Sequence, residues 1–191
     1  MPELTGKLAL VTGASRGFGY EVAKALAAKG AHILAVARTV GGLEELDDEI
    51  KQAGGEATLV PLDIKDDPGL ERLGAAIFQR WGGLDVFVHS AAHATPMGPT
   101  EHVADKDLDS AIAVNFRAVQ RLIRVIDPLL KQREAAQAVF VSAPDESGAK
   151  FQSAYGAAKA AGEAVARSYA VESARKGPRV WLGAPPPMPT A

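Results

Sequence analysis

The sequence predicts an α/β fold in which a doubly wound, mostly parallel sheet lies between two layers of helices. Two observations predict it: short apolar runs alternate with stretches of helical periodicity, and the runs are apolar throughout, as strands covered on both faces are. Parallel neighbours need crossover helices, which gives a three-layer α/β/α arrangement. A length of 191 residues suits one domain, so we expect a single domain over 1–191 built on one sheet.

The first three strand and helix pairs follow from apolar spacing and from glycine stops. In the third helix, for example, Leu70, Leu73, Ile77 and Trp81 step by three and four residues before a Gly-Gly pair. The expected elements are strand 8–11, helix 18–29, strand 32–36, an acidic helix ending at 54–55, strand 58–62 and a helix ending at 82–83.

The second half repeats the alternation with longer helices. After strand 84–88 and a loop of small residues and proline, we expect one long helix from about 104 to 132, strand 138–141, an alanine-rich helix from about 153 to 175 and strand 179–182. Residues 184–191 are rich in proline, which lacks an amide donor and fixes its backbone. We therefore expect an extended strap there.

Composition narrows the classes of partner. Lys plus Arg number 21 and Asp plus Glu 23, so the charge of -2 offers no basic excess for nucleic acid or an anionic membrane. The chain has no cysteine, no signal-like N-terminus and no apolar run long enough to span a membrane. Lack of cysteine fits a reducing compartment, and we expect a cytoplasmic protein.

A glycine-rich turn, Thr12–Gly19, follows the first strand and opens the first helix. Glycines there permit a tight turn and let a pyrophosphate approach the free amides at the helix N-terminus. The spacing is G-x-x-x-G-x-G rather than the strict G-x-G-x-x-G, and a glycine turn can also be a purely structural connection. Its place at the start of the alternating pattern favours a dinucleotide site.

The end of the second strand bears on the choice of cofactor. A NAD-selective fold places an acid there to bind the ribose hydroxyls, whereas this chain has Arg38, with Arg16 in the glycine turn. Guanidinium groups suit a ribose 2'-phosphate. We therefore expect NADP(H) to be favoured over NAD(H), although either arginine could be a solvated surface charge.

Candidate catalytic residues gather in the second half of the chain. Tyr155 and Lys159 are spaced i, i+4, so they lie on one helix face, and Ser142 stands at the carboxyl end of the preceding strand. Asn115 lies in the long helix. A free phenol has a pKa near 10, so a tyrosine base near neutral pH needs a nearby cation, which Lys159 can supply.

With these residues, the chain resembles the short-chain dehydrogenase/reductase family from Lys7 to Thr190. Members of that family have a Rossmann fold. The resemblance implies that Tyr155 is the general acid/base, that Lys159 lowers its pKa and binds the nicotinamide ribose, that Ser142 positions the substrate oxygen and that Asn115 completes a proton relay. It also implies a cofactor-binding set: Thr12, Gly13, Ser15, Arg16, Gly17, Phe18, Gly19, Arg38, Asp63, Ile64, Ser90, Ala91, Ala92, Asn115, Tyr155, Lys159, Pro185 and Thr190.

The chain departs from the family pattern in several places. His89-Ser90-Ala91-Ala92 stands where Asn-Asn-Ala-Gly is usual, which puts the nicotinamide approach in question. Residues 144–147 are acidic, and Pro186 replaces a usual glycine. His89 and His93 lack a third ligand of suitable spacing, so we expect no metal. Family members usually continue into substrate-covering helices, and we expect this chain to lack that substrate lid.

Two functions remain open from the sequence. The first is an NADP(H)-preferring oxidoreductase that exchanges a hydride with a carbonyl or secondary alcohol, a 3-oxoacyl reductase among other possibilities. The second is a dinucleotide-binding protein with little or no turnover because the substrate lid is missing. The substrate and the reaction direction are not fixed by the sequence. By resemblance, the two long helices form a two-fold contact, so a homodimer is expected.

Overall fold

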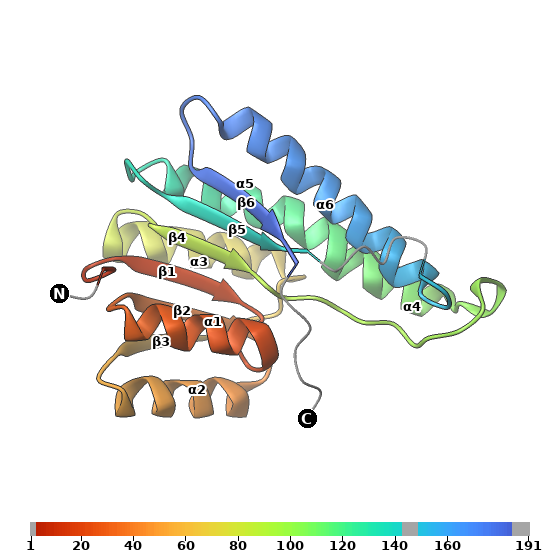
Figure 1. Cartoon of the computed structure of the whole chain (residues 1–191), viewed down its shortest axis with the longest axis horizontal. Helices are drawn as coiled ribbons and strands as arrows, with labels where there is room; N and C mark the ends of the chain where they lie inside the picture. The colour runs from red at the N-terminus through yellow and green to blue at the C-terminus, as the bar shows by residue number, and fades with distance from the viewer. Residues whose placement is uncertain (1–2, 143–148, 185–191) are drawn as a thin grey trace.

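Six parallel strands form one sheet in the computed structural model, which describes residues 3–142 and 149–184 (Figure 1). Their order, β3-β2-β1-β4-β5-β6, confirms the doubly wound prediction. The crossover direction reverses between β1 and β4, and in such sheets ligands bind outside the carboxyl ends at this point. The strands are β1 (Leu8–Thr12), β2 (His32–Ala37), β3 (Glu56–Pro61), β4 (Val86–His89), β5 (Gln137–Val141) and β6 (Arg179–Gly183).

Helices cover both faces of the sheet. α1 and α2 lie on one face, and α3, the α4-to-α5 run and α6 lie on the other (Figure 1). The helices are α1 (Gly17–Ala28), α2 (Val40–Gln52), α3 (Asp67–Trp81), the 3-10 turn η1 (Thr100–His102), α4 (Asp105–Ile112), the π-helical turn η2 (Ala113–Arg117), α5 (Ala118–Leu130) and α6 (Ser153–Ser173). None of the helices described is both long and apolar enough to cross a membrane.

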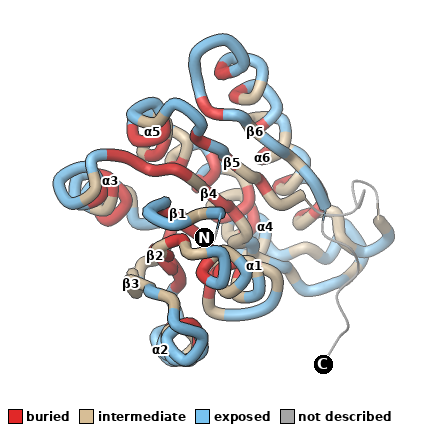
Figure 2. The backbone as a smooth tube through the Cα atoms, turned by 60° about the vertical axis from the view of Figure 1, so that its left-hand side comes forward, coloured by how far each residue is buried: buried red, intermediate tan, exposed pale blue. Residues whose placement is uncertain are grey.

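Two separate cores explain why the strands are apolar throughout. All five residues of β1 are buried, and they alternate between the cores: Leu8 and Leu10 pack beneath α3, α5 and α6, whereas Ala9 and Val11 pack beneath α1 and α2. Buried positions accordingly gather on the strands and on the helix sides that face them (Figure 2). An alternating pattern would have left one face polar.

The long helix expected over 104–132 is interrupted by the π-helical turn η2. A π turn widens the helix by one residue, and such turns are frequent at functional sites. This one carries the buried Asn115 and packs against Gly162 of α6, where an added Cβ would collide with the Asn115 carbonyl oxygen. The helix therefore continues through 104–130 in direction but not in hydrogen-bond pattern.

The fourth strand begins two residues later than expected. Leu84 is buried, but its amide donates to the Leu129 carbonyl at 3.1 Å rather than to a neighbouring strand. The next residue, Asp85, accepts hydrogen bonds from the Leu8 amide and from Lys7 Nζ, each at 3.0 Å. These two residues connect α5 and β1 before β4 starts. The expected strap at 184–191 and the acidic segment 144–147 lie outside the described residues, apart from Ala184.

Candidate active site

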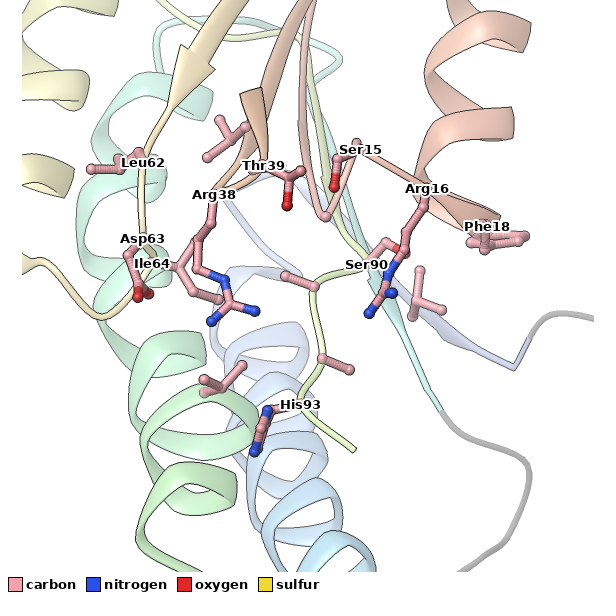
Figure 3. A pocket seen from close by; sticks show the side chains of 18 of the residues that line it. Ser15, Arg16, Phe18, Arg38, Thr39, Leu62, Asp63, Ile64, Ser90 and His93 are labelled. Carbon is pink, nitrogen blue, oxygen red and sulfur yellow. The ribbon is translucent and has the colours of Figure 1, made fainter. Parts of the chain in front are cut away.

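A cleft of about 670 Å³ opens at the carboxyl ends of the central strands. The volume lies within the usual range of roughly 300–1,000 Å³ for small-molecule sites. Figure 3 shows side chains from both halves of the sheet pointing into it. The predicted site residues that line it are Gly13, Ser15, Arg16, Gly17, Phe18, Arg38, Asp63, Ile64, Ser90, Ala91, Ala92, Ser142, Tyr155 and Lys159.

The other predicted site residues lie elsewhere. Thr12, Gly19 and Asn115 are buried and do not line the cleft, so any part they have in binding acts through their neighbours. Pro185 and Thr190 lie outside the described residues.

Glycines shape the first turn in two different ways. Gly13 has a φ of 72°, and a Cβ there would lie 2.8 Å from the backbone of Ala91, so the turn packs directly on the loop after β4. Gly17 also has a positive φ, 61°, but a Cβ there would meet nothing within 4 Å. The first glycine therefore permits packing, and the second leaves open space at the start of α1.

Thr12 and His89 join β1 to β4 beneath this turn. Thr12 Oγ1 lies 2.9 Å from His89 Nδ1 and accepts a hydrogen bond from the Ala91 amide at 3.4 Å. Thr12 and His89 thus share one hydrogen bond, whose donor depends on which ring nitrogen of the histidine carries the proton. Burial, and secondarily the charge of Lys159, lowers the pKa of His89 to about 3. A neutral imidazole thus occupies the place of the usual asparagine, a role the sequence did not reveal.

Two cationic side chains enter the cleft from the first half of the sheet. Arg38 follows β2 and Arg16 lies in the glycine turn, and Figure 3 shows both guanidinium groups directed into the cleft. Asp63, after β3, lies on the same side as Arg38, but its carboxylate is already engaged. It accepts from the Lys65 amide at 2.9 Å and lies 3.5 Å from Lys65 Nζ.

Asn115 uses its whole amide group to hold the loop after β4. Its Oδ1 accepts from the His93 amide at 2.8 Å, and its Nδ2 donates to the His93 carbonyl at 2.9 Å. The residue is 2% exposed. Its side chain thus fixes the backbone beside the cleft, while the imidazole of His93 lines the cleft.

Tyr155, Lys159 and Ser142 line the cleft from the second half of the chain. Tyr155 and Lys159 come from successive turns of α6, and Lys159 Nζ donates to the Val141 carbonyl at 3.0 Å. Ser142, the residue directly after β5, donates a hydrogen bond from its hydroxyl to Oε1 of Glu163. Glu163 was not a sequence candidate, although it continues the i, i+4 spacing of Tyr155 and Lys159.

Among residues 3–142 and 149–184, no group of three or more His, Asp or Glu side chains is arranged to hold a metal ion. His89, one of the two histidines considered for such a site, already shares its Nδ1 with Thr12.

The sequence was compared with known families and proteins. Residues 7–191 match the sequence model of the short chain dehydrogenase family. The chain belongs to the short-chain dehydrogenase/reductase family. Members of this family are oxidoreductases that bind nicotinamide cofactors.

Curated relatives and solved structures agree with the family assignment. A fatty acyl-CoA reductase from Acinetobacter baylyi is 34% identical over 170 residues, which cover 87% of this chain and 57% of that protein. The ketoacyl reductase HetN from a Nostoc species is 32% identical over 161 residues, covering 84% of this chain and 56% of that protein. This chain therefore spans a little over half the length of these two members of the family.

Family members of known structure superpose closely. One described as a short chain dehydrogenase from Pseudomonas syringae matches with a TM-score of 0.93 and 33% identity, covering 100% of this chain and 79% of that one. A metagenomic short-chain oxidoreductase in complex with NADP matches with a TM-score of 0.90 and 30% identity, covering 96% of this chain and 84% of that one.

Proposed function

We propose that this protein is an NADP(H)-preferring oxidoreductase that transfers a hydride between the nicotinamide cofactor and a carbonyl or secondary alcohol. The observation that carries the proposal is that Tyr155, Lys159 and Ser142 line the same cleft as the glycine turn and the two arginines. One cleft thus holds groups suited to a dinucleotide and groups suited to proton transfer to an oxygen.

The residues present fit a dinucleotide. The open space at Gly17 lies at the N-terminus of α1, where backbone amides and the helix dipole favour a pyrophosphate. Arg16 and Arg38 supply two cations for a 2'-phosphate, and Arg38 occupies the place where an acid would select NAD(H). The bound nicotinamide would supply or accept the hydride.

The chain's own residues handle the proton. In the reduction direction, the Tyr155 hydroxyl donates its proton to the substrate oxygen; in oxidation, the tyrosinate takes the proton of the alcohol. The Lys159 ammonium, one helical turn away, stabilises the tyrosinate electrostatically. Its bond to the Val141 carbonyl holds this cation against the end of β5.

Ser142 and Asn115 position the reacting groups. Ser142 lies at the end of β5 beside Tyr155, where its hydroxyl can reach a substrate oxygen once it turns from Glu163. Asn115 acts through its two bonds to the His93 backbone, which fix the loop after β4. Each of these bonds uses one of the two donors or acceptors on its atom, so the same amide can also take part in the proton relay that the resemblance implies.

The direct test is the oxidation of NADPH against a panel of ketones and aldehydes, run beside cofactor binding. Tyr155→Phe should abolish turnover and leave the Kd for NADPH within about twofold of wild type, since only the proton-transferring group is removed. Unchanged turnover in Tyr155→Phe would contradict the assignment. Binding of NADPH without turnover of any carbonyl would instead support the second candidate, a dinucleotide-binding protein, which is favoured by the engagement of Ser142 with Glu163.

A further inference from the structure

The hydroxyl of Ser142 is engaged by a side chain that has no part in the proposed mechanism. Ser142 donates its proton to Oε1 of Glu163, and Arg167 Nη2 donates to the other carboxylate oxygen, Oε2, at 3.1 Å. The Glu163 side chain is 21% exposed. The carboxylate is therefore held between the cleft and a surface cation.

Successive turns of α6 hold successive residues of β5. Lys159 binds the Val141 carbonyl and Glu163 binds the Ser142 hydroxyl, so the spacing of four residues along the helix matches neighbouring groups at the strand end. Tyr155, Lys159, Glu163 and Arg167 thus form one row on α6. Glu163 therefore lies on the same face of α6 as Tyr155 and Lys159.

A serine hydroxyl has one proton to donate. A carbonyl oxygen accepts hydrogen bonds but cannot donate one. It can therefore bind the Ser142 hydroxyl only by replacing Glu163 as the acceptor of its hydrogen bond. An alcohol carries its own proton and can donate to Oγ of Ser142 while the bond to Glu163 persists. A hydrogen bond to a carboxylate is stronger than one to a neutral acceptor, so the carbonyl is the weaker competitor.

We propose that Glu163 is a positioning residue. Its carboxylate accepts the hydrogen bond of the Ser142 hydroxyl and thereby weakens the binding of a carbonyl compound relative to its alcohol. The proposal rests on the proposed function for the choice of ligand class. It concerns the binding of each ligand alone, because the overall equilibrium of the reaction is unchanged by any substitution in the enzyme.

The test measures binding without turnover. Cyclohexanone is titrated into the full chain with saturating NADP⁺, and cyclohexanol with saturating NADPH, two mixtures in which no hydride can be exchanged. Glu163→Ala should lower the Kd for cyclohexanone by about fivefold to tenfold and leave that for cyclohexanol within about twofold, because only the ketone competes for the Ser142 proton. Glu163→Gln keeps a neutral acceptor and should give a smaller shift, which serves if the alanine variant does not fold.

Two controls separate positioning from a structural effect. Ser168 donates to Glu172 at 2.9 Å on the same helix, so Glu172→Ala removes a matched serine partner and should change neither Kd. In a Ser142→Ala background, Glu163→Ala should have no further effect on the Kd for cyclohexanone. A shift that persists without Ser142, or an equal shift for both ligands, would overturn the proposal.

The remaining outcomes are also decisive. Cyclohexanone binding that becomes detectable only in Glu163→Ala supports the proposal, and undetectable binding in both proteins contradicts it. If the predicted shift occurs but wild type reduces no carbonyl in the NADPH assay, the proposed function fails and the role of Glu163 stands. If wild type turns over carbonyls without the shift, the role of Glu163 alone fails.

Discussion

Under the proposed function, cofactor selection depends on Arg38. It follows β2, and its guanidinium points into the cleft in the same region as Asp63 (Figure 3). The carboxylate of Asp63 already interacts with the amide and the ammonium group of Lys65. Arg38, at the end of β2, is therefore the charged group of this pair that can meet a ribose substituent. A guanidinium there attracts a 2'-phosphate and gives no advantage to a ribose hydroxyl.

Arg38→Ala should therefore raise the Kd for NADPH by about tenfold to hundredfold and change that for NADH by less than about threefold. The reason is the loss of one charge-assisted bond to the 2'-phosphate, which NADH lacks. Cofactor fluorescence titration measures both constants. Arg80→Ala is the control, since Arg80 stacks on Trp81 at the far end of α3 and should alter neither. An equal loss for both cofactors would contradict a role in selection.

His89 gives the fold a specific dependence on pH. Burial lowers the pKa of His89 to about 3, below the ordinary value of 6.5, so the unfolded chain binds a proton that the folded protein excludes. Stability from this group is complete above about pH 6.5 and is lost as pH falls toward 3. Lowering the pH from 7.5 to 5.5 should reduce the free energy of unfolding by about 1 kcal/mol through His89 alone.

His89→Asn restores the residue usual in the family and removes this titration. In urea unfolding at pH 7.5 and 5.5, the free energy of unfolding of wild type should fall by about 1 kcal/mol more than that of the variant across that interval. All other titrating groups are common to both proteins and largely cancel in the comparison. Equal losses would mean that His89 takes up its proton in the folded state.

The helix α6 packs closely against the π-helical turn η2 beside the site. Gly162 has no side chain, which lets the Asn115 carbonyl approach the α6 backbone. Gly162→Ala should destabilise the protein by about 1–3 kcal/mol in urea unfolding, because the added methyl must displace that carbonyl. Gly41→Ala in α2 meets nothing within 4 Å and should be neutral or stabilising by up to about 1 kcal/mol. Similar effects at both positions would contradict the packing argument.

The elements themselves were predictable because the strands are apolar runs, the central ones buried on both faces, and because the helices repeat their apolar spacing. The glycine turn, Arg38, Tyr155 and Lys159 were predictable as cleft residues because parallel strands bring their carboxyl ends to one edge. The π-helical turn was not predictable, since it accompanies a close contact between Gly162 and Asn115, two residues that are distant in sequence. Glu163 was missed because its bond to Ser142 depends on which way a side chain points rather than on residue type.

Some apolar side chains are exposed on the helical layer that contains α4 and α6. Among the described residues, Leu108 of α4 and Val171 of α6 are exposed, Val171 by 78%. Both helices lie on the same face of the sheet, and they contact each other (Figure 1). We propose that these helices contact a second copy, the arrangement that the resemblance implies.

A homodimer through α4, α5 and α6 should give a mass in light scattering of about twice that of the 19.9 kDa chain, since a two-fold contact pairs the same patch on each copy. Val171→Glu should convert it to a monomer, because an unpaired charge would then be buried in the interface. Phe78→Glu changes an equally apolar side chain, 55% exposed, on α3, and should leave the dimer intact. A dimer that tolerates Val171→Glu but dissociates with Phe78→Glu would place the interface on α3 instead, and a monomeric wild type would exclude the contact altogether.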